Sequence, residues 1–406
     1  MPPLRVHSGF PSARHCDYHI VEETGSHIIK EYEDMTLIQN LNSEKSPIWV
    51  VLDAPYSNDS ANNSILSSGY GYNFKKIWKL GGISLNDTHI RSLRPCLGAT
   101  YDTAKVHFDL IQEIEKYRPT IIVVLSDELL NYLVPETTQA KEDNSSLRKW
   151  AGSLLCSKFI HHPHYIVGSL SPEDVTKEWS YNEIQAFIDF GHVKEEFQYW
   201  KKYGDLRPLP KRNILVEPTY SDVISYLNGC LDLYSRGRLP FISVDIETLR
   251  PRKGSFYYGT NPGYPYTICI ARSSIEAISF SLWDYGEDRC MIIWRLLNEL
   301  LQKIPQIGQN YFSFDSHYLK AMGIRLRLRD CRDTQIRHHI LWPSLKHALH
   351  FQTRQYTREP YYKDEGKNFN IKHKKEFMIY NGKDGCVTKE IYDEQEKEFQ
   401  ERPWLQ

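Results

Sequence analysis

The stretch FISVDIETLR, residues 241–250, constrains the fold of this chain more than any other. Its β-branched residues and flanking prolines predict a strand whose Ile242 and Val244 belong to a core. Asp245 and Glu247 are two residues apart, so on a strand their side chains project from the same face. Two neighbouring carboxylates repel each other and are costly to bury. A cation beside them would make this arrangement stable.

Length and composition narrow the class of protein. A chain of 406 residues is too long for one compact core, so two domains are expected. Hydrophobic residues make up 41% and charged residues 25%, the balance of a globular protein, and the net charge of −1 leaves nucleic-acid contacts to local basic patches. The eight cysteines form no CxxC pair or Cys/His cluster, which argues against structural zinc and a disulfide framework. No apolar run approaches the roughly 18 residues of a membrane span, so we expect a cytoplasmic protein without membrane association.

The first half of the chain predicts an α/β layer. The apolar runs 48–55 and 120–126 are typical of buried parallel strands, and segment 105–118 between them has helical spacing. A further candidate strand, 158–169, is interrupted by Pro163. Strand, helix and strand in this order favour a sheet covered by helices.

A segment rich in proline and charge, 200–213, separates the two halves and has no apolar period. We therefore place one domain at 1–205 and a second at 213–406. The second half again predicts an α/β fold, with helices at 217–234, 291–304 and 375–399, a strand at 266–273, and a strand passing into a helix within 305–324.

Further acids follow at places where a metal ion would need them. Asp315 lies just inside the helix that follows the QIGQN strand. Tyr380 and Asp384 are four residues apart and share one face of the helix at 375–399. Such acids, together with the pair on the first strand, can converge on hard divalent cations, which prefer oxygen ligands. Two such ions about 3.5–4 Å apart can bind the attacking and leaving oxygens of a phosphoryl displacement.

The motifs DIET, NYFSFD and YNGKD resemble the three exonuclease motifs of the DEDD, or DnaQ-like, 3′→5′ exonucleases. Tyr380, four residues before Asp384, is similar to the DEDDy branch, whereas Ile379 stands where the other branch has a histidine. The segments 333–349, 356–367 and 380–394 resemble the proofreading domain of phage-type family A DNA polymerases. The resemblance covers about 213–406.

This resemblance implies a ribonuclease H-like domain, a mixed sheet flanked by helices, that hydrolyses phosphodiester bonds at DNA 3′ ends in proofreading. It implies two Mg²⁺ or Mn²⁺ ions held by Asp245, Glu247, Asp315 and Asp384, with Tyr380 orienting the attacking water. Its substrate-binding positions are Thr248, Leu249, Asn310 and Phe314. The segment 250–265 is longer than a typical hairpin loop, which leaves the substrate geometry there open.

Alternatives stay open at this point. Each site residue also has a structural interpretation: a solvated acid pair on the first strand, a helix N-cap for Asp315 and a core position for Tyr380. A non-catalytic module that binds DNA or a partner on the same fold, and an RNase of that fold, are the rival functions. No polymerase motif follows residue 394. The chain is then a fragment of a polymerase, or a nuclease that acts alone or with a separate polymerase subunit.

Basic residues predict a track for single-stranded DNA. Arg325, Arg327 and Arg329 alternate and would line one face of a strand, and 353–376 interleaves basic residues with tyrosines. A solvated, charged loop is the alternative for that segment. Three histidines, His338, His339 and His347, are expected on a helix surface or at the core edge and not as metal ligands.

The first half has a faint resemblance to the uracil-DNA glycosylase superfamily. It rests on VVLDAPYSND (50–59) and IHHPHYIVGS (160–169), which resemble two active-site loops that face each other, and on 69–83, which resembles the family's next helix. Ala54 stands where some glycosylases carry a water-activating acid, and His164 follows the His-Pro pair in place of a small residue. We expect a glycosylase-like α/β domain that does not excise uracil; an α/β domain that binds DNA or a partner is the alternative.

Overall fold

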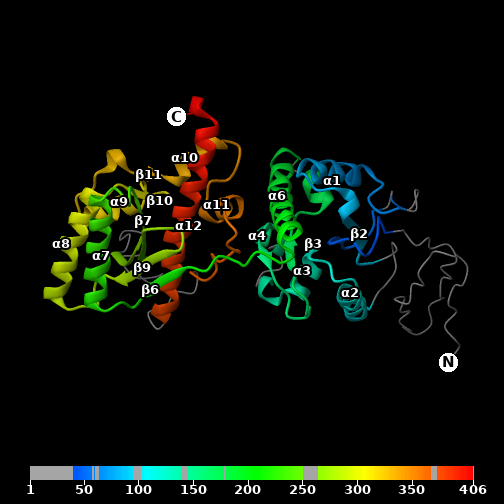
Figure 1. Cartoon of the computed structure of the whole chain (residues 1–406), viewed down its shortest axis with the longest axis horizontal. Helices are drawn as coiled ribbons and strands as arrows, with labels where there is room; N and C mark the ends of the chain where they lie inside the picture. Colours follow the sequence, from blue (N-terminus) through cyan, green and yellow to red (C-terminus); the bar gives the residue numbers. More distant parts are fainter. Residues whose placement is uncertain are drawn as a thin grey trace, which may run out of the picture. The chain divides into compact units, whose positions relative to one another are not determined.

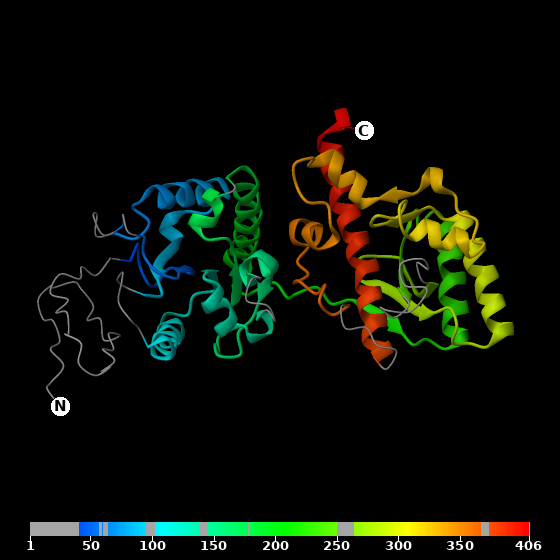
Figure 2. The same cartoon turned by 180° about the vertical axis from the view of Figure 1, so that it is seen from behind.

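The computed structural model describes residues 40–56, 59, 64–94, 102–138, 145–177, 179–249, 264–366 and 373–405. The chain divides into two compact units, Met1–Pro208 and Leu209–Gln406. In each unit a sheet is covered by helices, as Figures 1 and 2 show from opposite sides. None of the helices in the described part of the chain is long and apolar enough to cross a bilayer.

The N-terminal unit alternates strands and helices. Its strands are β1 Ile48–Leu52, β2 Thr88–Ser92, β3 Ile121–Leu125, β4 Leu154–Leu155 and β5 Tyr165–Gly168. Its helices are α1 Gly69–Leu80, α2 Thr103–Tyr117, α3 Asp127–Leu133, α4 Ser146–Trp150, α5 Pro172–Lys177 and α6 Trp179–Tyr203. The α/β layering expected from the apolar runs is confirmed.

The sheet of this unit explains those continuous apolar runs. Its described strands lie in the order β2-β1-β3-β5-β4, and all neighbours are parallel except β4 and β5. Every residue of β1 and β3 is buried. Parallel strands bury both faces because their crossover connections place helices on both sides, so the strands need no polar alternation.

The prediction that the two glycosylase-like loops face each other is wrong. Residues 53–56 follow β1 and lie at the carboxyl edge of the sheet, whereas the His-Pro loop precedes β5 and lies at the amino edge, because β1, β3 and β5 are parallel. There His162 Nε2 contacts the carbonyl of Pro119, just before β3. The residues that share a pocket with 53–56 include Ser126 and Ser171, which follow β3 and β5.

The C-terminal unit has a longer series of elements. Its strands are β6 Asn213–Val216, β7 Ile242–Leu249, β8 Tyr264–Ala271, β9 Glu276–Ser281, β10 Gln306–Gly308 and β11 Arg332–Asp333. Its helices are α7 Tyr220–Ser235, α8 Glu287–Lys303, α9 Asp315–Ala321, α10 Thr334–Leu341, α11 Leu349–Tyr356 and α12 Lys374–Glu401. The strand and helices expected around the acids are all present.

As expected, the described strands of this unit form a mixed sheet; their order is β11-β10-β7-β8-β9-β6. β7 is antiparallel to β8 and parallel to β10. One face of β7, with Ile242, Val244 and Ile246, packs in a core with residues of α7 and α8 such as Leu227 and Leu297. Its other face carries the acids and is covered by α12, which contacts β7, β8 and β9.

Two glycines allow α12 to lie close to the sheet. A Cβ atom on Gly382 would overlap with Ile214 of β6, and one on Gly385 would overlap with Cys269 of β8. Cys269 is the partner of Asp245 in the β7–β8 pairing. The two glycines of the NGKDG stretch therefore let the helix backbone lie close to β6 and to β8, the strand that pairs with the acid-bearing β7.

Two expectations about basic and histidine residues need correction. Residues 324–327 are not a strand and 328–330 form a 3₁₀ turn, so Arg325, Arg327 and Arg329 do not line a strand face, although all three are exposed. His338 is completely buried, not at a helix surface. Its ring bonds to His347 and Gln355, which satisfy both nitrogens inside the core.

Candidate metal centre

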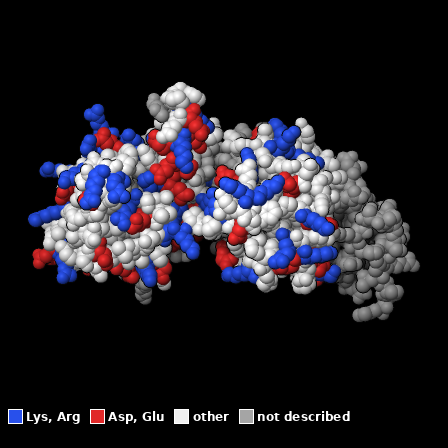
Figure 3. Space-filling view, in the orientation of Figure 1, with Lys and Arg blue, Asp and Glu red and all other residues white. Residues whose placement is uncertain are grey.

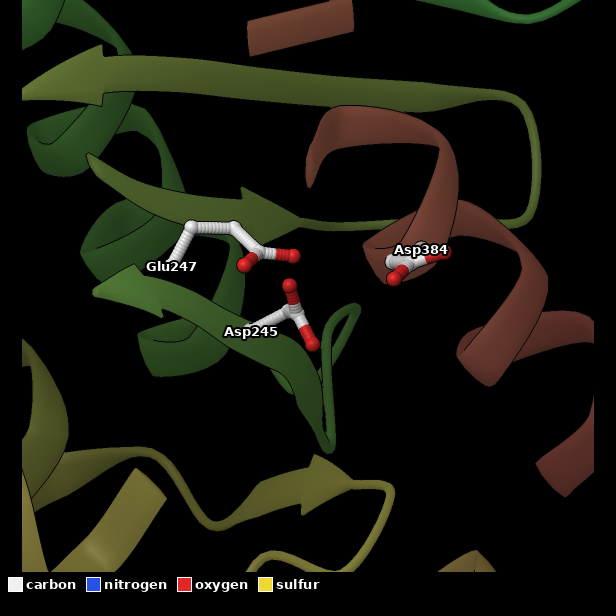
Figure 4. A group of neighbouring side chains, drawn as sticks. All are labelled: Asp245, Glu247 and Asp384. Carbon is white, nitrogen blue, oxygen red and sulfur yellow. The ribbon is translucent and has the colours of Figure 1, made fainter. Parts of the chain in front are cut away.

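Three carboxylates meet between β7 and α12. One oxygen from each of Asp245, Glu247 and Asp384 lies within 4.8 Å of the others. Figure 4 shows the first two on the strand and the third on the helix beside it. Strand alternation points the first pair to one face, and the glycine-mediated approach of α12 brings the third.

Neighbouring side chains fix the orientation of these carboxylates. The Asn381 side-chain amide donates to Asp245 Oδ2 at 2.7 Å, and its carbonyl oxygen accepts from Ser279 Oγ at 2.7 Å. The Tyr362 hydroxyl donates to Asp384 Oδ1 at 2.6 Å. Because Asn381 and Tyr362 are themselves buried, both carboxylates are held in one rotamer before any ligand arrives.

Asp315 lies beside this group and is not one of the three. It begins α9, it is buried, and its Oδ1 accepts the backbone N–H of Ile246 at 3.0 Å. Ile246 stands between Asp245 and Glu247, so this bond ties the fourth acid to the strand that carries the first two. The other Asp315 oxygen has acceptor capacity left for a cation.

The acid group is electrostatically strained. Burial raises the pKa of Asp245 well above its usual range, and the carboxylates of Asp384, Asp315 and Glu247 raise it further. Burial also raises the pKa of Asp315, and Glu247 adds to that effect, while the Ile246 N–H opposes it. Carboxylates that repel one another in a low-dielectric pocket favour the binding of positive charge.

Tyr380 lies beside the acids, as its helical spacing from Asp384 predicts. Its hydroxyl accepts a hydrogen bond from Lys363 Nζ at 2.8 Å. Burial raises the pKa of Tyr380, and Asp384, Glu247 and Asp245 raise it further, so the phenol stays protonated at neutral pH. Lys363 also reaches Asp384 Oδ2 at 2.5 Å, which removes it from the basic track on which we expected it.

The substrate positions implied by the resemblance lie at the end of β7 and in the turn before α9. Thr248 follows an irregularity in the β7–β8 pairing, and Leu249 ends β7, with its side chain outside the described residues, as is the loop 250–263. Asn310 is exposed, with a left-handed φ of 56°, a conformation that asparagine tolerates. Phe314 is half-buried, directly before Asp315, and its ring packs against Tyr318.

Sequence reasoning missed four residues that shape the site: Asn381, Tyr362, Lys363 and Asp333. Asp333 is buried and accepts from the backbone of Asn310 at 3.0 Å and Phe312 at 3.2 Å, so it sets the turn that precedes Asp315. Asp333 also caps the N-terminus of α10. An aspartate directly before a helix is a sequence signal for such a cap. The other three lie inside segment 356–367 and the YNGKD motif, but no periodicity indicates their contacts.

The donor set fits a hard divalent cation. Asp245, Glu247 and Asp384 offer only carboxylate oxygens, the ligands that Mg²⁺ and Mn²⁺ favour, and Asp315 supplies another at the edge. The described part of the group contains no cysteine or histidine that would select a softer ion. Three of the four carboxylates expected at a metal site, Asp245, Glu247 and Asp384, therefore converge in the structure, and Asp315 is bonded to the strand that carries the first two.

The face of the molecule drawn in Figure 3 shows no broad basic field for nucleic acid among the described residues. On the face drawn in Figure 3, basic and acidic side chains are interspersed over both units. With a net charge of −1, this distribution agrees with contacts made by local basic groups.

No family model matches the chain, and none of the curated proteins matches it. Among solved structures, the chain is similar to the EXO domain of Nibbler from Aedes aegypti at 12% identity and a TM-score of 0.36, over 49% of this chain and 96% of that domain. It is similar to RNase D from Escherichia coli, an exoribonuclease involved in structured RNA processing, at 15% identity and a TM-score of 0.35, over 48% of this chain and 47% of that one. For Pol1 from M. smegmatis, whose POL domain was solved with DNA primer-template and dNTP, identity is 12% and the TM-score 0.34, over 48% of this chain and 28% of that one.

Proposed function

We propose that the C-terminal unit is a metal-dependent 3′→5′ exonuclease of the DEDDy type that hydrolyses phosphodiester bonds at DNA 3′ ends. One observation carries the proposal. Asp245, Glu247 and Asp384 converge, with Asp315 bonded to the same strand and the Tyr380 hydroxyl beside them. A partly buried group of mutually repelling acids costs stability, so it needs a functional reason such as metal binding.

The acids would hold two Mg²⁺ or Mn²⁺ ions, which would supply positive charge to the attacking and leaving oxygens of a phosphodiester. This chain's own residues supply the geometry. Asn381 and Tyr362 fix the orientation of Asp245 and Asp384. The Tyr380 hydroxyl is protonated, accepts from Lys363 and lies within hydrogen-bonding reach of Asp384; with metal bound at Asp384, its hydrogen would orient a water molecule.

Single-stranded DNA and DNA 3′ ends are the partners we propose, held by Thr248, Leu249, Asn310 and Phe314 and by exposed basic groups such as Arg325. A proofreading role beside a polymerase domain or subunit follows from the sequence resemblance.

The test uses one DNA strand labelled at either end. With Mg²⁺, a 5′ label should give a ladder of shortened strands, whereas a 3′ label should appear at once as mononucleotide. EDTA should stop both. Asp384→Asn should abolish hydrolysis, while Asp393→Asn, on the same helix in a partly exposed pair with Lys389, should leave the rate unchanged.

The rival functions give different results in the same assay. Faster hydrolysis of an RNA strand of the same sequence would identify an RNase. Metal-independent binding of DNA without hydrolysis would identify a non-catalytic module. Loss of activity in Asp393→Asn as well as Asp384→Asn would show that the acids act through stability alone.

A further inference from the structure

Lys363 places its ammonium group in contact with the acid group. Its Nζ lies 2.5 Å from Asp384 Oδ2 and 2.8 Å from the Tyr380 hydroxyl, and it sits 4.8 Å from the centre of the Tyr380 ring. The lysine side chain is 19% exposed and that of Asp384 is 4% exposed, so water screens the pair weakly. The Tyr362 hydroxyl occupies the other oxygen, Asp384 Oδ1.

The loop that carries Lys363 is anchored on both sides. Before it, Glu359 pairs at 2.8 Å with Arg212, a buried residue that also pairs with Glu390 of α12 at 2.7 Å. After it, Glu365 pairs with Lys383 of α12 at 2.9 Å. Ion pairs on both sides of Lys363 hold its loop against α12, so the fold positions the lysine beside Asp384.

Both oxygens of Asp384 are therefore engaged in this structure, one of them by a cation. For Asp384 to ligate a metal ion through Oδ2, the ammonium of Lys363 has to leave that oxygen. Two positive charges at one carboxylate repel each other, so metal and lysine bind in competition.

We propose that Lys363 is a tethered cation that competes with the divalent metal for Asp384, holding the acid group together without metal and lowering its metal affinity. This inference rests on the metal site of the proposed nuclease and adds a positioning residue to it. It predicts that removing the lysine charge lowers the stability of the metal-free protein but raises its affinity for the metal ion. A residue that merely supports the fold would not move those two quantities in opposite directions.

The experiment measures free Mn²⁺ by electron paramagnetic resonance while the full chain is titrated, and follows thermal unfolding in EDTA. Lys363→Met should bind Mn²⁺ about tenfold more tightly than the parent or better, equivalent to ~1.4 kcal/mol. Its unfolding temperature in EDTA should be lower, and Mn²⁺ should raise it by more than in the parent. Lys363→Arg, which keeps the charge, should bind Mn²⁺ like the parent.

Lys389→Met is the matched control, because Lys389 lies on α12 and pairs with Asp393, away from the acid group. It should leave Mn²⁺ affinity unchanged. If Lys363→Met does not fold in EDTA, Lys363→Gln replaces it, because its amide can still donate to Asp384.

Mn²⁺ affinity that is equal or weaker in a folded Lys363→Met or Lys363→Gln variant overturns this inference and leaves the proposed nuclease intact. Absence of Mn²⁺ binding in the parent removes the metal site, and the inference falls with it.

Discussion

Gly385→Ala tests whether the close approach of α12 assembles the acid group. The added Cβ would come closer than 3.0 Å to Cys269 Sγ and lie 3.5 Å from Ala271 Cβ. A Cβ atom cannot lie closer than 3.0 Å to the Cys269 sulfur, so α12 or β8 has to shift. Overpacking of this kind costs about 1–3 kcal/mol, and the helix preference of alanine over glycine returns about 0.5–1 kcal/mol. The net expected loss of stability is about 0–2.5 kcal/mol.

The same shift acts on the chemistry, because Asp384 is the preceding residue. A displacement approaching 1 Å at a reacting group can cost on the order of a hundredfold in rate. We therefore expect hydrolysis to fall by at least about tenfold at temperatures where Gly385→Ala is folded. Stability is measured from the unfolding transition that responds to Mn²⁺, and rate from the end-labelled DNA strand.

Gly229→Ala is the matched control. Gly229 is inside α7, and the nearest atom to its added Cβ is Arg272 Nη1 at 3.8 Å, so there is room for the methyl group. This variant should gain about 0.5–1 kcal/mol and keep the parental rate. If Gly385→Ala also gained stability and kept its rate, the close helix–sheet contact would not be what positions Asp384.

Three further predictions address the tyrosine, a buried histidine and the N-terminal unit. Tyr380→Phe should slow DNA hydrolysis less than Asp384→Asn does, because a hydroxyl that orients water is less essential than a metal ligand; equal and total loss would show that the tyrosine is misassigned. Burial lowers the pKa of His338 to about 4. At pH values between the ordinary pKa of histidine and pH 4, the unfolded chain therefore binds a proton that the folded chain does not. Stability should thus fall by about 3 kcal/mol between pH 7 and pH 4, and denaturant unfolding of His338→Gln should lack this component; an identical pH slope in both would refute it. Finally, the full chain in EDTA should leave no alkali-sensitive sites in uracil-containing DNA, and breaks that disappear in Asp53→Ala would identify a working glycosylase.

Local patterns account for much of the C-terminal site. Alternation along β7 places Asp245 and Glu247 on one face, and helical spacing places Tyr380 beside Asp384. Alternation misled at Arg325–Arg329, where leucines and arginines alternate through an irregular segment and a 3₁₀ turn. Alternation of polar and apolar residues indicates only that every second side chain is exposed. An irregular segment that runs over the surface can expose alternate residues, as a strand does.

The sequence by itself determined which residues face together within one element, because burial imposes a period on each strand or helix. Only the tertiary structure decided which elements meet. It brings Asn381 to Asp245 and Lys363 to Asp384, contacts between residues far apart in the chain that no period records. It also places the His-Pro loop at the amino edge of the N-terminal sheet, away from residues 53–56, because strand direction fixes the edge at which each loop emerges. Periodicity reports the environment of a residue, whereas partners depend on strand order, strand direction and the small residues that let a helix approach a sheet.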